Sequence, residues 1–163
     1  MRTEPLTRRL LKFWVAAGTI ELATDESRDI YAGGYRAFGP VRIHETGARD
    51  TTFSPPEPIT TLGTYAIGVA EDGTGDVVVS AFSRLLRLNR NGNFAPTFQE
   101  PTVSPSPAGP AGSGSVLTIV PIPDGTRDFY AGGAFIAYNG GPANNFARIH
   151  ADGSLASTGT ALP

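Results

Sequence analysis

The two histidines are the side chains of this sequence best suited to acid–base chemistry or metal binding at neutral pH. Each ends a triplet of Arg, an aliphatic residue and a polar residue, and the triplet occurs at Arg42–His44, Arg87–Asn89 and Arg148–His150. A position that accepts either His or Asn at the end of a strand fits the start of a polar turn better than catalysis or metal binding. Histidines in separate repeats would also lie too far apart to share an ion.

Pairs of aspartates four residues apart are a second candidate, because hard cations such as Ca²⁺ bind clustered oxygen ligands. The pairs are Asp25/Asp29, Asp72/Asp76 and Asp124/Asp128. Two carboxylates are fewer ligands than a calcium loop supplies. The residues between them are typical of hairpin turns, including Asp-Gly in the second and third pairs. We therefore interpret the aspartates as turn residues and predict no metal site.

Motifs of nucleophilic and nucleotide-binding enzymes do not occur in the sequence. It contains no Gly-x-Ser-x-Gly, no Walker loop and no Gly-x-Gly-x-x-Gly. Zero Cys excludes thiolate catalysis and Cys-ligated metal sites. A glycosidase uses two carboxylates that flank the scissile bond, but no spacing here selects such a pair. The sequence predicts a non-enzymatic protein with no catalytic residues and no cofactor.

The elements that carry these residues belong to one unit that occurs three times, over residues 19–53, 66–98 and 118–159. Each copy has an Ile five residues before the first Asp, then the Asp pair, the Arg triplet and a Gly three residues beyond it. The second aspartates are spaced by 76 − 29 = 47 and 128 − 76 = 52 residues. The first and third copies also share Tyr-Ala-Gly-Gly, at Tyr31–Gly34 and Tyr130–Gly133. Fixed features at this period indicate a repeat architecture.

Short strands joined by turns are expected within each copy. In the first copy the predicted strands are Ile20–Ala23, Ile30–Tyr35, Arg42–His44 and Thr51–Phe53. Paired glycines weaken a strand and mark the close approach of another backbone. Four short strands in 40 to 50 residues are typical of a propeller blade. We predict an all-β fold of three propeller-blade-like antiparallel repeats, forming an incomplete or oligomer-completed β-propeller.

The predicted organisation divides the chain into four parts. They are an N-terminal arm and lead-in at 1–18, a first repeat with its linker at 19–61, a second repeat with a low-complexity linker at 62–115, and a third repeat with a C-terminal tail at 116–163. The linker at Gln99–Ser115 is rich in Pro, Ser, Gly and Ala. That composition predicts an extended surface loop.

Two stretches resemble a known repeat family. Residues 128–155 and 29–53 resemble the Delta-60 repeat, a bacterial β-propeller repeat with no assigned biochemistry. The third copy matches best, including Tyr138–Gly140 and the turn at Asp152–Leu155. The second copy departs, with Ser80-Ala81 in place of the double glycine and no Tyr-Asn-Gly loop. The resemblance implies a propeller fold and carries no catalytic residues.

The N-terminal arm has apolar residues at helical spacing with basic residues between them. One interpretation is a helix that docks on an acidic or apolar partner, and the other is a lead-in segment that packs on the first blade. The candidate partner-docking residues are Leu6, Arg8, Arg9, Leu10, Phe13 and Trp14.

The net charge and the number of blades limit the kinds of partner that we expect. A net charge of −2 gives no reason to expect nucleic acid, and no apolar stretch reaches the roughly 18 residues of a membrane span. Three blades are fewer than the roughly four to eight of a closed ring, so strand edges stay open. We expect protein partners, symmetry mates or further polypeptide to cover them, in preference to the arm folding back.

These observations favour a structural or interaction module that belongs to an oligomer or complex. The expected setting is a larger assembly, such as a bacterial surface or virion-type particle, with an extracellular, cell-surface or virion location favoured over the cytoplasm. The alternative is a carbohydrate-binding or carbohydrate-active propeller. A groove of aromatic residues and carboxylates at a blade edge would favour sugar binding.

Overall fold

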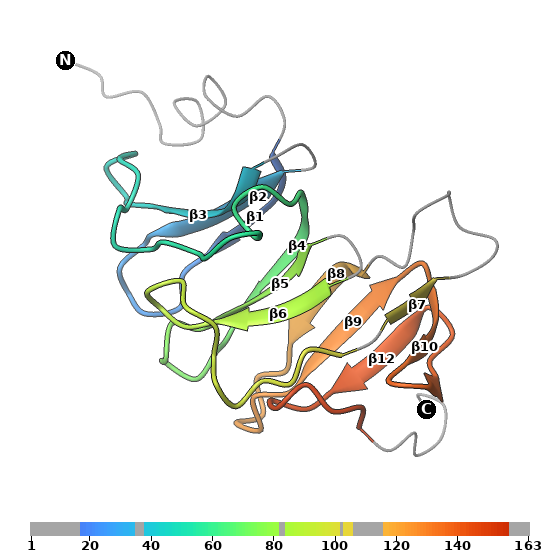
Figure 1. Ribbon diagram of the computed structural model, residues 1–163. Helices are drawn as coiled ribbons and strands as arrows, with labels where there is room; N and C mark the ends of the chain where they lie inside the picture. The colour runs from blue at the N-terminus through green and yellow to red at the C-terminus, as the bar shows by residue number, and fades with distance from the viewer. Residues whose placement is uncertain (1–16, 35–37, 82–83, 102, 106–115, 157–163) are drawn as a thin grey trace.

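The computed structural model describes residues 17–34, 38–81, 84–101, 103–105 and 116–156, and their regular structure is entirely β-strand (Figure 1). Three antiparallel sheets of three strands follow one another along the chain and fan out side by side. The first contains β1 (Ala17–Leu22), β2 (Ile30–Gly34) and β3 (Phe38–Ile43), the second β4 (Thr64–Val69), β5 (Val77–Ala81) and β6 (Arg84–Leu88), and the third β8 (Val116–Pro121), β9 (Phe129–Gly133) and β12 (Phe146–Ile149). The all-β, blade-like fold predicted from the sequence is confirmed.

A fourth, smaller sheet joins the low-complexity linker to an insertion in the third repeat. It consists of β7 (Val103–Pro105), β10 (Phe135–Tyr138) and β11 (Gly141–Pro142). Asn139 and Gly140 turn the chain between β10 and β11, both with positive φ, as a two-residue hairpin turn requires. The prediction of a surface loop over Gln99–Ser115 is therefore wrong at Val103–Pro105, which forms a strand with Val103 buried.

The predicted fourth strand at Thr51–Phe53 is also wrong. Pairing ends in a single bridge between Ile43 and Arg49, and Leu88 with Phe94 and Ile149 with Leu155 repeat that bridge in the other copies. In the first copy the Thr52 amide donates to Asp50 Oδ1 at 2.8 Å. This local turn competes with continued pairing, so each blade has three strands and one bridge.

Alternation along the strands gives each sheet two distinct faces. We call the face that looks toward the next sheet in the chain the leading face, and the opposite one the trailing face. In the first sheet Tyr31 and Gly33 lie on the leading face, and Ile30 and Ala32 on the trailing face. The sheets pack leading face to trailing face, so the chain forms a directional stack.

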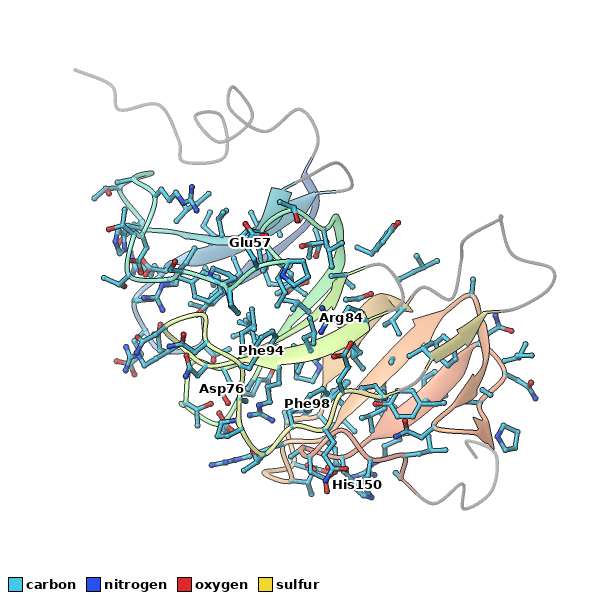
Figure 2. All side chains as sticks on the ribbon, viewed as in Figure 1. Glu57, Asp76, Arg84, Phe94, Phe98 and His150 are labelled. Carbon is cyan, nitrogen blue, oxygen red and sulfur yellow. The ribbon has the colours of Figure 1, made fainter. Side chains whose placement is uncertain are left out.

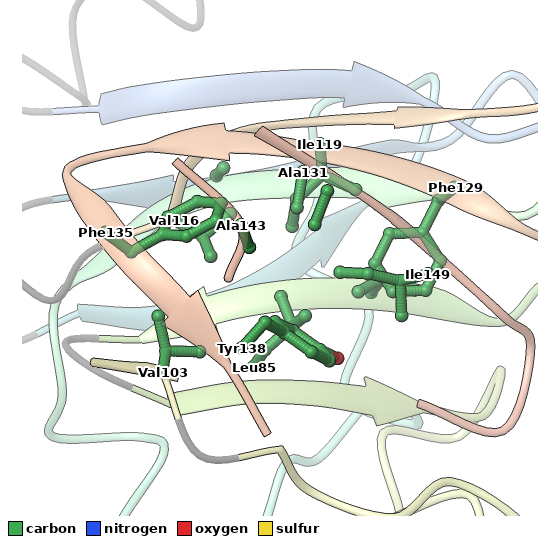
Figure 3. Packing of buried hydrophobic residues seen from close by; sticks show 13 residues of the cluster. Leu85, Val103, Val116, Ile119, Phe129, Ala131, Phe135, Tyr138, Ala143 and Ile149 are labelled. Carbon is green, nitrogen blue, oxygen red and sulfur yellow. The ribbon is translucent and has the colours of Figure 1, made fainter. Parts of the chain in front are cut away.

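Apolar side chains fill the space between successive sheets. Between the first and second sheets the cluster is Ala23, Tyr31, Phe53, Ile59, Ile67, Val69, Val77, Val79, Leu86 and Leu88. Between the second and third, Leu85 and Val78 meet Ile119 and Phe129, joined by Phe135 and Tyr138 of the β10 insertion (Figure 3). The core therefore has a separate apolar layer at each sheet-to-sheet interface, and a third buried cluster lies on the trailing face of the first sheet.

Glycines allow the closest approaches between sheets. A Cβ on Gly33 would lie 2.6 Å from Thr64 Cβ in β4, and a Cβ on Gly68 would lie 2.5 Å from Ile119 Cγ2 in β8. The first double glycine thus marks a neighbouring sheet, as predicted, although the approaching atoms belong to a side chain. A Cβ on Gly132 would meet Thr118 Cγ2 at 2.8 Å, within its own sheet. Among the described residues there is no helix long and apolar enough to cross a membrane.

Candidate interaction face and the repeated Asp–Arg constellation

The first aspartate of each pair builds the turn that precedes the second strand of its repeat. In all three copies its Oδ1 accepts hydrogen bonds from the amide and the hydroxyl of the residue two further on. The acceptors and donors are Asp25 with Ser27, Asp72 with Thr74 and Asp124 with Thr126. The interpretation of these aspartates as turn residues agrees with this geometry.

The second aspartate of each pair has a different role, because it binds the arginine of the triplet. Arg87 Nε donates to Asp76 Oδ2 at 2.9 Å, and Arg148 Nε donates to Asp128 Oδ2 at 3.0 Å. In the first repeat Arg42 Nε lies 3.6 Å from Asp29 Oδ2. Turn formation alone therefore does not explain the aspartate pairs.

The third triplet position begins a glycine turn in every copy. The amides of Gly47, Gly92 and Gly153 donate to the carbonyls of His44, Asn89 and His150 at 2.7, 2.8 and 2.9 Å. The predicted role as a turn starter thus describes the backbone.

The side chains of that position differ between the repeats. His44 Nδ1 lies 3.1 Å from Asp29 Oδ2, and His150 Nδ1 lies 3.2 Å from Asp128 Oδ2. Asn89 Oδ1 instead accepts the amide of Asn91 at 2.9 Å within its own turn. Asp76 and His150 lie at the same end of the second and third sheets, in the lower half of the molecule in Figure 2.

One group in the first repeat has the composition of a metal site. Single ligand atoms of Asp29, His44 and Asp50 lie within 4.8 Å of one another. However, the Arg42 guanidinium lies among the carboxylates, with Nε donating to Asp50 Oδ2 at 2.6 Å and a second ion pair from Nη2. Burial would raise the pKa of Asp50, but hydrogen bonds from Thr52 and Arg42 outweigh it and bring the pKa to about 2. The group is best described as a buried ion-pair network.

The triplet arginines also join one sheet to the next. Arg42 Nη1 donates to the Arg90 carbonyl of the second sheet's glycine turn at 2.9 Å. Arg87 Nη1 donates to the Ala151 carbonyl of the third sheet's glycine turn at 3.5 Å. Each arginine is thus oriented by an aspartate of its own sheet and reaches the equivalent carbonyl of the sheet that follows.

Three further contacts cross the interfaces near the aspartate turns. The Tyr31 hydroxyl donates to the Gly75 carbonyl at 3.2 Å. Arg90 lies 3.9 Å from Asp25, and Arg127 Nε lies 2.8 Å from Asp72 Oδ2, so each later sheet sends an arginine back to the aspartate turn of the earlier one. The cleft of about 140 Å³ beside Asp72 and Arg127 is therefore lined by groups that already pair with each other.

The leading face of the third sheet has no following sheet among the described residues. The strand registers place its members together: Thr118, Val120, Tyr130, Gly132, Phe146 and Arg148. Val120 and Phe146 are exposed, and the Tyr130 and Phe146 rings stack with centroids 5.2 Å apart. Arg148 keeps its pairs with Asp128 and Asp124, at 2.9 and 3.4 Å. We call the packed interface between two successive sheets a joint. This face has the residues of one side of a joint and is exposed to solvent.

The candidate docking residues of the N-terminal arm lie outside the described residues. They are Leu6, Arg8, Arg9, Leu10, Phe13 and Trp14. The sequence reasoning did not recognise the inter-sheet role of Arg42 and Arg87. The signal available for it was the recurrence of Arg at the first triplet position in all three repeats.

Comparison with known proteins gives a partial match. None of the curated proteins matches the chain significantly. A family model described as a domain of unknown function (DUF5122) beta-propeller matches residues 129–158, which begin at β9 and include β12. The matched stretch supports a β-propeller repeat family, in agreement with the blade-like sheets.

Proposed function

We propose that this chain is a non-enzymatic structural or interaction module made of Delta-60-type blades. It acts as a subunit of a larger assembly, such as a bacterial surface or virion-type particle. One observation carries the proposal: the leading-face position of Arg148 is buried in the first two sheets, as Arg42 and Arg87, whereas in the third sheet it is partly exposed, beside the exposed Val120 and Phe146. A partner that covers this face supplies the second surface of an inter-sheet interface.

The energetic argument follows from the exposed side chains. Burying a Val or Phe side chain contributes about 1.5–3 kcal/mol, and Val120 and Phe146 lie on the same face. Arg148 is already held by Asp128, so less side-chain entropy is lost when it binds a partner carbonyl. Exposed apolar surface rimmed by charge is typical of protein–protein interaction sites.

The non-enzymatic part of the proposal rests on how the charged groups are used. Asp76 and Asp128 hold arginines that orient toward a neighbouring sheet or solvent, so their carboxylates serve an ion pair. The pKa of Asp72 is lowered, because hydrogen bonds from Thr74 and the nearby arginines outweigh the effect of burial. A general acid at neutral pH needs the opposite shift.

The experiment is the native mass of the tagged full chain, isolated from the cells that produce it and measured by light scattering. A mass well above 17.1 kDa that falls when Phe146 is changed to Glu supports the proposal. The matched control is Ile136→Glu, which alters an exposed apolar residue of β10 outside this face. A mass of 17.1 kDa in every preparation would contradict it.

A second candidate, carbohydrate binding, is favoured by one specific observation. Tyr130 and Phe146 stack on the exposed face, and Arg148 with its partner Asp124 lies on the same sheet. Aromatic rings beside hydrogen-bonding charges are the groups that bind sugars. Oligosaccharide binding by the isolated chain, lost in Phe146→Ala and retained in Ile136→Ala, would favour this candidate over assembly.

A further inference from the structure

We infer that the partner of the third sheet's leading face is the first sheet of a second copy of this chain, so that two copies close one six-bladed ring head to tail. The inference rests on the proposed function and names the partner. Closed propellers have roughly four to eight blades. Besides the small β7–β10–β11 sheet, the described residues contain three blade-like sheets, and six is the one multiple of three within that range.

The apolar contacts of the proposed joint follow from the equivalent positions of the three repeats. In the chain Gly68 of the second sheet lies against Ile119 of the third. One repeat further on, these positions are Val120 and Ile20, because Ile20, Ile67 and Ile119 are equivalent. Val120 and Ile20 are each 53% exposed, and Leu22 next to Ile20 on the same face is also exposed. The first sheet carries Glu21 at the position of Gly68, and that side chain is exposed, so a residue larger than Gly occurs at this position of a packed sheet.

The trailing face of the first sheet has the composition of an interface. Ile30, Ala32, Val41 and Ile43 form an apolar cluster of their own, separate from the two inter-sheet layers. Their equivalents in the second sheet are Val77, Val79, Leu86 and Leu88, which pack against the first sheet. These four side chains are already buried in the single chain, at 3–8% exposed, so the part of this face that is open to a second copy is Ile20 and Leu22 of β1.

The hydrogen bonds between successive sheets can be transferred in the same way to the third sheet and the first sheet of the second copy. Arg42 and Arg87 donate to the carbonyl that follows the triplet of the next sheet, and the corresponding acceptor for Arg148 is the Glu45 carbonyl of the second copy. Tyr130 is equivalent to Tyr31, which donates to the Gly75 carbonyl. The corresponding acceptor for Tyr130 is the Arg28 carbonyl of the second copy.

Charge complementarity points to the same pairing. The existing pair Arg127–Asp72 becomes, one repeat on, Arg28 of the second copy with Asp124. Arg28, Gly75 and Arg127 have positive φ values of 58°, 72° and 66°, so the three turns have the same local backbone conformation. Arg28 and Asp124 are both exposed, with opposite charge at opposite ends of the stack of sheets.

The test is a charge exchange between copies, followed by sedimentation velocity of the full chain. The two variants are Val120→Glu and Ile20→Lys, both at positions that are exposed in the single chain. The native chain is expected at 2 × 17.1 = 34.2 kDa. Each variant alone places a charge against an apolar side chain in both joints, and we expect its dimer dissociation constant to rise at least about tenfold.

An equimolar mixture of the two variants is the decisive sample. In the head-to-tail arrangement the mixed dimer contains one native joint and one joint in which the introduced glutamate faces the introduced lysine. The 34.2 kDa species (2 × 17.1) therefore returns. Ile136→Glu, the matched control, stays dimeric. A native dimer that the mixture fails to restore would overturn the head-to-tail pairing and leave the assembly role standing.

Other masses also have fixed meanings. A native chain that remains at 17.1 kDa at every concentration would overturn the second copy as partner. An assembly that contains a different protein would do the same while supporting the proposed function. A monomer that stays monomeric even when isolated from the cells that produce it would contradict both proposals.

Discussion

Arg42 and Arg87 have the same place in their repeats as Arg148, but the surroundings of the three side chains differ. The exposed fractions of their side chains are 9%, 5% and 40%. All three have an acidic partner in their own sheet, and only the first two reach a carbonyl of a following sheet among the described residues. Each repeat therefore supplies the arginine and its acidic partner. The position of the sheet in the stack decides whether a following sheet supplies the carbonyl acceptor.

The largest expected effect is the loss of a buried arginine. Arg42→Met leaves the buried carboxylate of Asp50 and that of Asp29 without their cation, and breaking a buried pair in this way costs about 3–5 kcal/mol. Urea unfolding followed by circular dichroism measures the loss.

Arg148→Met is the matched control for that variant. Its guanidinium is 40% exposed, so at low protein concentration we expect a much smaller loss than in Arg42→Met. Equal losses in the free energy of unfolding would show that the leading face of the third sheet is not one side of a joint that lacks its partner.

Gly33→Ala and Gly132→Ala compare the same position in a filled and an open interface. The new Cβ at residue 33 would lie 2.6 Å from the buried Thr64, so the sheets must separate, at a cost of roughly 1–3 kcal/mol. At residue 132 the nearest atom is the terminal methyl of Thr118, which lies on the exposed face. We expect a smaller loss there, measured by the change in thermal midpoint. The reverse order would contradict the directional stack.

The pH dependence of stability tests the buried carboxylate of Asp50 in the first joint. Asp50 has a pKa of about 2 in the folded chain, below its ordinary value of 3.8, because Thr52 and Arg42 outweigh the effect of burial. A lowered pKa stabilises the fold above pH 4, and this contribution disappears as the pH falls from about 4 to 2. We expect a loss of the order of 1 kcal/mol over that range. Asp50→Asn should flatten the profile, and an unchanged profile would contradict this account.

The smallest effect is expected at the histidines. Replacing His44 and His150 together by Asn should change the free energy of unfolding by less than about 0.5 kcal/mol, because Asn89 already fills the equivalent turn position. Equilibrium unfolding and metal analysis of the double variant measure this. Loss of a bound metal ion in the variant would show that Asp29, His44 and Asp50 form a metal site.

Much of the fold could be predicted from particular residues. The recurring Ile, the aspartate pairs and Tyr-Ala-Gly-Gly located three sheets, because turn chemistry and strand alternation are local properties. The fourth strand at Thr51–Phe53 was predicted wrongly, since Asp50 and Thr52 bond to each other. The strand at Val103–Pro105 was missed, because its pairing partner is the distant β10 and its surroundings have the composition of a loop.

The candidate site was harder to predict. The acceptors of Arg42 and Arg87 are backbone carbonyls in the following repeat. Every residue has a backbone carbonyl, so the residue types do not indicate which one accepts the hydrogen bond. Sequence reasoning identified open edges as the unfinished part of the fold. The structure adds an exposed sheet face, whose members come from three strands and share no sequence pattern.

The most direct test of the central claim uses disulfide trapping, since the native sequence contains no cysteine. Val120→Cys and Ile20→Cys are introduced together into the full chain, and the protein is oxidised and separated without reductant. The head-to-tail joint predicts a covalent dimer of 2 × 17.1 = 34.2 kDa that reductant returns to 17.1 kDa, while Ile136→Cys with Ile20→Cys gives little dimer. A product that stays monomeric, or equal trapping in the control, would contradict it.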